Sequence, residues 1–472
     1  MEPGFQPRVL PYSDVADASP PLTLRSAAAR LRGVVGISLC DEGLFAFAVA
    51  TTHAPYLRSL TVCGDGGDDD AWSGSAHCGD RDVVLARGAR LSGLAMSLVV
   101  AGNCVAMLCW APAIDAVGRK YVATRSLAGL SLGLAILGAA ARLGDRGDRG
   151  AAVAVSLVAY VFMASTSGTT AAMSASASDL APKDQGSQSV VFAIKWCGWG
   201  LGTVLAYGSG FFVLGLDLED YSFCYFSAAG VALLACVAST VVLRETLSAA
   251  PAKARCRLGV RGLAIVARSR KLRRVVAAFA LTTMGLLTPL SVVTSWGISN
   301  LGYAQETLSL VVFAQQVGAA LGFLLGGALR DALPADAALV AGNGLLAVSV
   351  AATGFGAPKW PGALWGTLSC LGVGLGVVTT ASSAVIGADV AREDQGIVQA
   401  ACQLCGYVGG ALGCLLGPRL YDPAATAAGA VARPFSAGAA IVVVSGLGLA
   451  LTTSRARVAR DDLAGPLLAP DA

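Results

Sequence analysis

The chain has 472 residues, of which 55% are hydrophobic and only 14% are charged, and its mean hydropathy is +0.65. A soluble protein of this length needs a charged surface over much of its area, and this composition cannot supply one. The net charge of +4 is not gathered into a basic stripe with interleaved aromatic residues, which argues against nucleic-acid binding. Apolar runs of about 18 residues or more are typical of membrane spans. They recur from about residue 32 to residue 455, so the composition predicts a polytopic membrane protein.

Along the chain, twelve long apolar segments are separated by charged residues, Gly and Pro, and we predict a span for each of them. The first 31 residues are polar and lack the basic-then-apolar order of a cleaved signal peptide. In hydrocarbon, spans of this length must be helices because only helices and closed barrels satisfy their own backbone. The predicted spans are 33–54, 91–112, 121–141, 151–174, 187–213, 221–243, 275–297, 306–329, 335–356, 362–387, 395–417 and 434–453.

The charge distribution predicts the orientation of these spans. The segment 244–274, between the sixth and seventh spans, carries ten Lys and Arg residues. Basic loops stay in the cytosol, and the even number of spans then places both termini there. We therefore expect the following parts: a cytosolic tail over 1–32, a six-helix bundle over 33–243, a basic central loop over 244–274, a second six-helix bundle over 275–453 and a cytosolic tail over 454–472.

The loop 55–90 follows the first span and is predicted to lie outside. It is long and acidic, and it contains Cys63 and Cys78. On an oxidising face these cysteines would form a disulfide, and the alternative is two free thiols. The plasma membrane is favoured over an organelle membrane.

The two halves repeat weakly. Asp179-Leu-Ala-Pro-Lys-Asp-Gln-Gly186 follows the fourth span, and Asp389-Val-Ala-Arg-Glu-Asp-Gln-Gly396 follows the tenth, 210 residues later. Asp115, after the second span, is matched by Asp331 after the eighth. Parallel repeats with matching loops on one face are a known plan of transporters. The expected fold is an all-α membrane protein with twelve transmembrane helices in two six-helix pseudo-symmetric bundles.

The loop Asp115-Ala-Val-Gly118-Arg119-Lys120 resembles the loop signature of the major facilitator superfamily, Gly-x-Leu-x-Asp-x-x-Gly-Arg-Lys. Ala111 stands where the first Gly belongs, and Ala113 stands where the Leu belongs. A degenerate copy, Gly327-x-Leu-x-Asp331, lies in the second half, and Arg244-Glu245-Thr246-Leu247 after the sixth span also resembles a family feature. The resemblance implies the superfamily fold and a cytosolic gate that holds the halves closed and opens during the transport cycle. The residues assigned to this gate are Asp115, Gly118, Arg119, Lys120, Asp179, Asp331 and Asp389, with Asp179 as a partner for Arg119.

Three ionisable residues lie deep in the predicted spans, where each costs roughly 2.5–3.5 kcal/mol on insertion scales. Asp41 and Glu42 lie about 14 Å into the first span, and Lys195 lies about 12 Å into the fifth, at 1.5 Å per residue. An acid and a base at similar depth are expected to pair or to bind a substrate charge. Our hypothesis is that Asp41 or Glu42 gains and loses a proton during transport. The alternatives are a structural acid–base pair, and a Lys195 that snorkels to the cytosolic face.

Several uncharged polar residues within the spans are further candidates for a substrate site. Each would bond either a substrate or a neighbouring helix. Two stripes of small residues, at Gly318/Gly322/Gly326 and Gly409/Gly413/Gly417, are expected to let helices approach closely and slide. The uncharged candidates are Asn103, Gln315, Gln316, Gln399 and Gln403.

The sequence thus favours a secondary transporter for a small organic solute, coupled to a proton or another cation, in a lipid bilayer. The alternatives are a facilitated-diffusion uniporter, for a sugar-like solute for example, and a transport-inactive sensor or scaffold on the same fold. There are only two His residues, and Walker motifs do not occur, so we expect neither an enzyme nor a metal site nor a cofactor. A monomer is expected.

Overall fold

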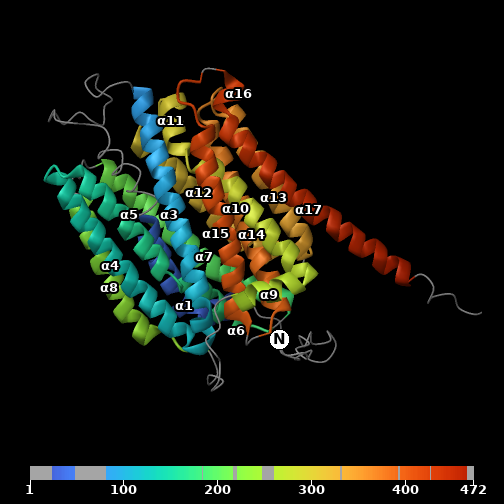
Figure 1. The fold of residues 1–472 in the computed structure, drawn as a ribbon. Helices are drawn as coiled ribbons and strands as arrows, with labels where there is room; N and C mark the ends of the chain where they lie inside the picture. The colour runs from blue at the N-terminus through green and yellow to red at the C-terminus, as the bar shows by residue number, and fades with distance from the viewer. Residues whose placement is uncertain are drawn as a thin grey trace, which may run out of the picture.

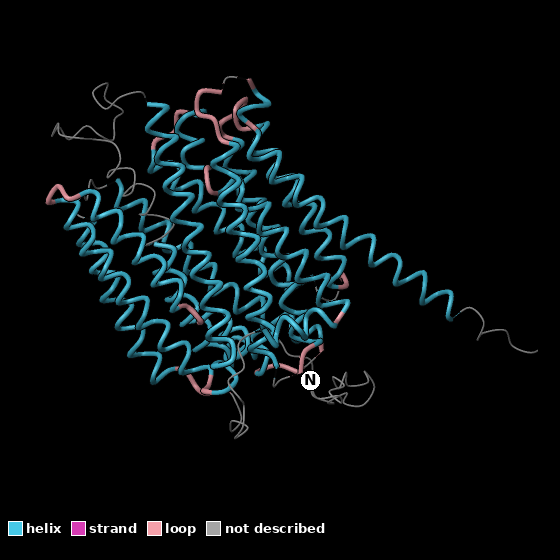
Figure 2. The backbone as a smooth tube through the Cα atoms, in the orientation of Figure 1, coloured by secondary structure: helices cyan, strands magenta, loops and turns pink. Residues whose placement is uncertain are grey.

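The computed structural model of the chain is a bundle of long helices (Figure 1). It describes residues 24–47, 81–182, 184–215, 221–246, 260–329, 332–391, 394–425 and 427–464. Within these ranges the secondary structure is helical and contains no strand (Figure 2). Cys63, Cys78 and Asp331, which the sequence singled out, lie outside the described residues.

The first six predicted spans correspond to helices that begin and end near the predicted limits, with three differences. The first helix starts at Leu24, nine residues before the predicted span at 33, and the second starts at Arg81, ten residues before the predicted span at 91. The fourth span is broken at Ser167 and Gly168 into two helices. The helices are α1 (Leu24–Ala46), α3 (Arg81–Ala116), α4 (Arg119–Asp145), α5 (Arg149–Thr166), α6 (Thr169–Asp179), α7 (Gln185–Gly215) and α8 (Tyr221–Val242).

The basic central segment contains a short helix, α9 (Val260–Arg268), before the second bundle begins at Arg270. The seventh span is broken after Pro289, which lies in the last turn of α10, so that α11 forms a separate helix. The remaining helices are α10 (Arg270–Leu290), α11 (Val293–Leu301), α12 (Gln305–Ala328), α13 (Ala335–Gly356), α14 (Ala363–Asp389), α15 (Gln395–Leu420), α16 (Ala428–Val431) and α17 (Arg433–Ala464). We call the end of the bundle at which α9 lies the α9 face.

Eleven helical stretches within the described residues are long and apolar enough to cross a membrane. α1 is more polar because it contains three arginines together with Asp41 and Glu42, and it packs inside the bundle against α7. With α1 the helical rods number twelve, in agreement with the predicted fold.

The helix contacts repeat between the two halves. α1 packs on α7 and α4 packs on α8 in the first half, just as α10 packs on α15 and α13 packs on α17 in the second. α3 and α5 pair in the same way as α12 and α14. Equivalent helices therefore have equivalent partners, which is the pseudo-symmetric arrangement that the repeated loops predicted.

The glycine stripes of the second half pack within that half. A Cβ on Gly322 would meet the carbonyl oxygen of Val373 on α14, and one on Gly413 would meet that of Met284 on α10. Such contacts leave room only for Gly and bring the helix backbones together. The close helix approach expected of these stripes is therefore confirmed, and it joins helices of one bundle.

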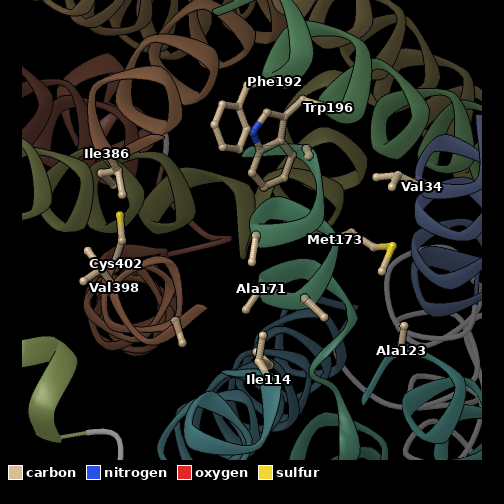
Figure 3. Close-up of a cluster of buried hydrophobic side chains, with 14 of the residues drawn as sticks. Val34, Ile114, Ala123, Ala171, Met173, Phe192, Trp196, Ile386, Val398 and Cys402 are labelled. Carbon is tan, nitrogen blue, oxygen red and sulfur yellow. The ribbon is translucent and has the colours of Figure 1, made fainter. Parts of the chain in front are cut away.

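The two halves meet where α3 lies along α15 and where α7 lies along α12. α3 is close to α15 at both ends, since Gly93 adjoins Pro418 and the Asp115 carboxylate adjoins Gly396. A large buried cluster joins the halves near the α9 face (Figure 3). Within it, Trp196 of α7 donates a hydrogen bond from Nε1 to Ser383 Oγ of α14 at 3.0 Å. In this structure α3 and α15 are therefore in contact near both ends of the bundle.

Candidate functional site

The structure brings the three deep ionisable residues together. Asp41 is 8% exposed and Lys195 is fully buried, and the charge of Lys195 interacts with those of Glu42 and Asp41. Lys195 Nζ lies 3.1 Å from the centre of the Trp196 ring, and it has no hydrogen-bond partner among the described residues. A buried ammonium without an acceptor is costly, so the acidic neighbours and the ring face are what stabilise its charge.

Asp41 and Glu42 line a small cavity of about 30 Å³. A cavity of this size holds about one or two waters, so an organic solute cannot occupy it until the helices move apart. Most of its wall comes from the first bundle, and one side chain, Tyr407 of α15, comes from the second. The lining residues are Asp41, Glu42, Phe45, Asn103, Ser126, Leu130, Met163, Ser167, Thr170 and Tyr407.

The break in the fourth span lies at this cavity. Gly168 donates its N–H to Ser126 Oγ at 2.8 Å, and this hydroxyl donates to Val122 O at 2.9 Å. The N-cap residue of α6, Gly168, has no side chain to cap the helix, and Asp41 lies beside Thr169, the first residue of α6. A carboxylate at a helix N-terminus is stabilised by the partial positive charge there. The broken helix therefore helps to place Asp41.

The cavity also reveals residues that the sequence did not single out, including Ser126, Ser167, Thr170 and Tyr407. One signal was present, because the run Ser-Thr-Ser-Gly-Thr-Thr over 165–170 interrupts an apolar span. Gly is tolerated in transmembrane helices when neighbouring groups satisfy the freed backbone, so the run alone does not separate a kink from a continuous helix.

The predicted polar candidates divide into two groups. Asn103 lines the cavity, is 6% exposed, and has an Oδ1 without a hydrogen-bond partner among the described residues. Gln316 instead accepts a hydrogen bond from Thr203 Oγ1 at 3.0 Å and so links α12 to α7. Gln315, Gln399 and Gln403 are buried but do not line the cavity.

The gate residues of the first half gather at the α9 face. Arg119 is 1% exposed and forms the predicted ion pair with Asp179. It also lies 3.6 Å from the Asp115 carboxylate and donates to Ala175 O at 3.2 Å. Asp115 accepts the N–H of Ile397 at 3.0 Å, close to the start of α15. One buried cluster thus ties the loop after α3 to both α6 and the second bundle.

Glu245, from the segment after α8, completes this cluster. Its carboxylate accepts the backbone N–H groups of Arg119 and Lys120, each at 3.2 Å, and so caps the N-terminus of α4. Gly118 has φ of 118°, and a Cβ there would lie 2.5 Å from Glu245 Oε2. Only Gly fits this backbone conformation and this space. Lys120 donates from Nζ to Thr240 O at 2.6 Å, near the C-terminus of α8.

The second half lacks a matching cluster among its described residues. Asp389 forms an ion pair at 2.8 Å with Lys271, at the start of α10, and Arg261 of α9 pairs with Asp394 at 2.9 Å. Both ion pairs join parts of the chain after residue 260. In this structure Asp389 therefore secures its own bundle and does not reach the first one.

Two helix bundles in contact, with a charged cavity in the first and a cluster of ion pairs at one face, are consistent with a membrane carrier. A sequence model of the Major Facilitator Superfamily matches residues 85–414. The chain belongs to this superfamily, and this membership implies transport of a solute across a membrane. No curated protein sequence matches the chain.

Solved structures share the fold at low sequence identity. The human organic anion transporter MFSD10 (TETRAN) is 18% identical with a TM-score of 0.69, and the match covers 91% of this chain and 100% of that one. The xylose transporter XylE from E. coli is 12% identical with a TM-score of 0.62, covering 89% and 97%. A bacterial homologue of the iron transporter ferroportin is 14% identical with a TM-score of 0.59, covering 90% and 99%.

Proposed function

We propose that the protein is a secondary active transporter that moves a small organic solute by alternating access and couples this movement to protons. The observation that supports this most strongly is the buried group of Asp41, Glu42 and Lys195 beside a cavity between the helices. Each buried charge costs several kcal/mol unless it is compensated (about 2.5–3.5 on insertion scales). A structural framework has little need of such a group, whereas a carrier that binds a proton does.

In the proposed mechanism, the charge balance of this group determines when the bundles can move. Two carboxylates and one ammonium leave one net negative charge in a water-poor site. A proton on Asp41 or Glu42 makes the group neutral and lowers the cost of closing helices around it. Loss of that proton restores the charge, which favours a state in which water reaches the site. Tyr407, the cavity residue from the second bundle, would then move with that bundle.

The cluster around Arg119 would act as the gate of one face. Opening the α9 face requires Asp115 to release the Ile397 N–H, because this bond links α3 to α15. Arg119 would stay with Asp179 in the first bundle. We assign the α9 face to the cytosol, together with both termini, and the protein to the plasma membrane as a monomer.

The comparisons do not define a single class of solute. By their names, MFSD10 carries organic anions and XylE carries xylose, and at these identities they share only the fold with this chain. Phe45, Met163 and Tyr407 give the cavity an apolar and aromatic side, which suits an organic solute.

The test is solute-induced proton flux in liposomes that contain the purified protein. The panel of solutes should include a sugar, an organic anion and an organic amine. Each solute is tested with the unsubstituted protein and with the variants Asp41→Asn and Glu42→Gln. We expect a proton signal with one class that is lost in one of the two variants. Labelled solute that crosses in both variants without proton flux would contradict coupling and leave a uniporter. No transport of any solute would favour an inactive scaffold.

A further inference from the structure

The cavity beside the broken fourth span is lined by residues with oxygen-bearing side chains from four elements. Asp41 comes from α1, Asn103 from α3, Ser126 from α4, and Ser167 and Thr170 from the break and the start of α6. Carboxylate, amide and hydroxyl oxygens are the ligands that hard metal cations prefer. In transporters, discontinuous helices of this kind often supply the binding sites of coupling ions.

Asn103 indicates that the cavity takes a positively charged ligand. Only 6% of this residue is exposed, and its Oδ1 has no hydrogen-bond partner among the described residues. A buried carbonyl oxygen without a donor is costly, and most buried oxygens have a partner. Asn103 lines the same cavity as Asp41, so a cation there would satisfy both side chains.

The net charge selects a monovalent cation. With all three groups ionised, Asp41, Glu42 and Lys195 carry one net negative charge, and no Lys or Arg lines the cavity. One monovalent ion brings the total to zero, whereas a divalent ion would leave an uncompensated positive charge in a buried site. The volume of about 30 Å³ accommodates a single small ion with a water and excludes an organic ammonium.

We propose that this cavity is a binding site for a monovalent metal cation of the sodium type, held by Asp41, Asn103 Oδ1 and the hydroxyl oxygens of Ser167 and Thr170. The site extends the transport function proposed above, because a bound Na⁺ would bring the group of Asp41, Glu42 and Lys195 to the same neutral charge as a bound proton. Binding itself can be measured with no solute present, so it can succeed or fail independently of the transport assay.

The probe is Na⁺ added to the purified full-length protein in detergent, at constant pH and at constant ionic strength kept with choline chloride. Thermal unfolding is followed with Na⁺, K⁺ or choline alone, and ²²Na⁺ binding is measured by scintillation proximity. A ligand that binds only the folded state raises the melting temperature in a saturable way. We expect this rise with Na⁺ and not with choline. Na⁺ affinity should fall by about 10- to 100-fold in Asn103→Leu and in Asp41→Asn, by analogy with other losses of a metal-site ligand or its support.

The matched control is Asn343→Leu. Asn343 is also a buried Asn within a span, but it lies in the second bundle, where it accepts from Thr282 Oγ1 at 2.6 Å and donates to Leu339 O at 2.9 Å. This variant should unfold at a lower temperature and keep the full Na⁺-dependent rise. The inference is overturned if Na⁺ has no effect beyond that of choline, or if Asn103→Leu and Asp41→Asn bind ²²Na⁺ as tightly as the natural protein. Solute-driven proton flux without Na⁺ binding would contradict the Na⁺ site and leave the transport proposal standing. Na⁺ binding without transport of any solute would contradict the transport proposal and leave the Na⁺ site standing.

Discussion

The two bundles share one plan of helix contacts but differ in what they bury at their centres. The first buries Asp41 and Lys195 beside the break between α5 and α6. The second buries a neutral network in which Thr282 Oγ1 donates to Asn343 Oδ1 at 2.6 Å and lies 3.0 Å from Ser445 Oγ. A neutral network of this kind stabilises helix packing at little electrostatic cost. The comparison suggests that one copy of the repeat performs the ion chemistry while the other provides the surface against which it moves.

The largest expected effect comes from removing the buried ammonium. Lys195→Met leaves two buried carboxylates without their counter-charge, and we expect a loss of about 3–5 kcal/mol in the free energy of unfolding, together with loss of transport. The measurements are reversible unfolding in mixed micelles and uptake into liposomes. The double variant Lys195→Met/Glu42→Gln should recover part of the stability and none of the transport.

The control for this variant lies at the matching position of the second bundle. Lys195 and Cys405 each lie nine residues after the repeated Gly, at Gly186 and Gly396. Cys405→Ala should cost about 1 kcal/mol and leave transport intact. Equal effects of the two substitutions would contradict the division between the bundles.

A second comparison concerns the ion pairs at the α9 face. Arg119→Ala leaves Asp179 and Asp115 buried without a cation, and we expect a destabilisation of about 3–5 kcal/mol and a gate that no longer holds closed. Lys271→Ala breaks the pair with Asp389, but the Lys271 side chain is 51% exposed. Exposed pairs contribute about 1 kcal/mol or less. Protease sensitivity of the α9 face and thermal unfolding would compare the destabilisation caused by the two substitutions. An effect of Lys271→Ala as large as that of Arg119→Ala would contradict this prediction.

A third comparison separates backbone conformation from packing at Gly118. Gly118→Ala forces a side chain into a conformation that costs about 1–3 kcal/mol and also into the Glu245 carboxylate. Gly147 likewise has a positive φ, of 88°, but nothing lies within 4 Å of a Cβ there. Gly147→Ala should therefore show the backbone cost alone. If both variants unfold at the same temperature, Glu245 does not hold Gly118 in place.

Much of this molecule follows from local patterns in the sequence. Apolar length predicts the spans because hydrocarbon forces the backbone to satisfy itself. The depth of Asp41 and Lys195 along their helices predicts that they lie at similar levels, and the structure places them within electrostatic range of each other. The Arg119–Asp179 contact follows from the family motif.

Other features could not be read from the sequence because they depend on contacts between distant segments. The capping of α4 by Glu245 joins positions 126 residues apart. Gln316 and Asn103 look alike in the sequence, but one finds a donor on α7 and the other lines the cavity. The partner of Asp389 also differs from that of Asp179, because the repeat preserved the aspartate and lost the Arg that would face it.

The central claim is that the charge of the first bundle controls the opening between the bundles, and distances between spin labels test it most directly. In a cysteine-free background, one label pair at Leu94 and Leu415 reports the face opposite α9, and a second pair at Val117 and Val260 reports the α9 face. All four side chains are exposed. We predict that Asp41→Asn/Glu42→Gln shifts the distance distribution of at least one pair relative to the protein with both carboxylates. Unchanged distributions at both faces would contradict the claim.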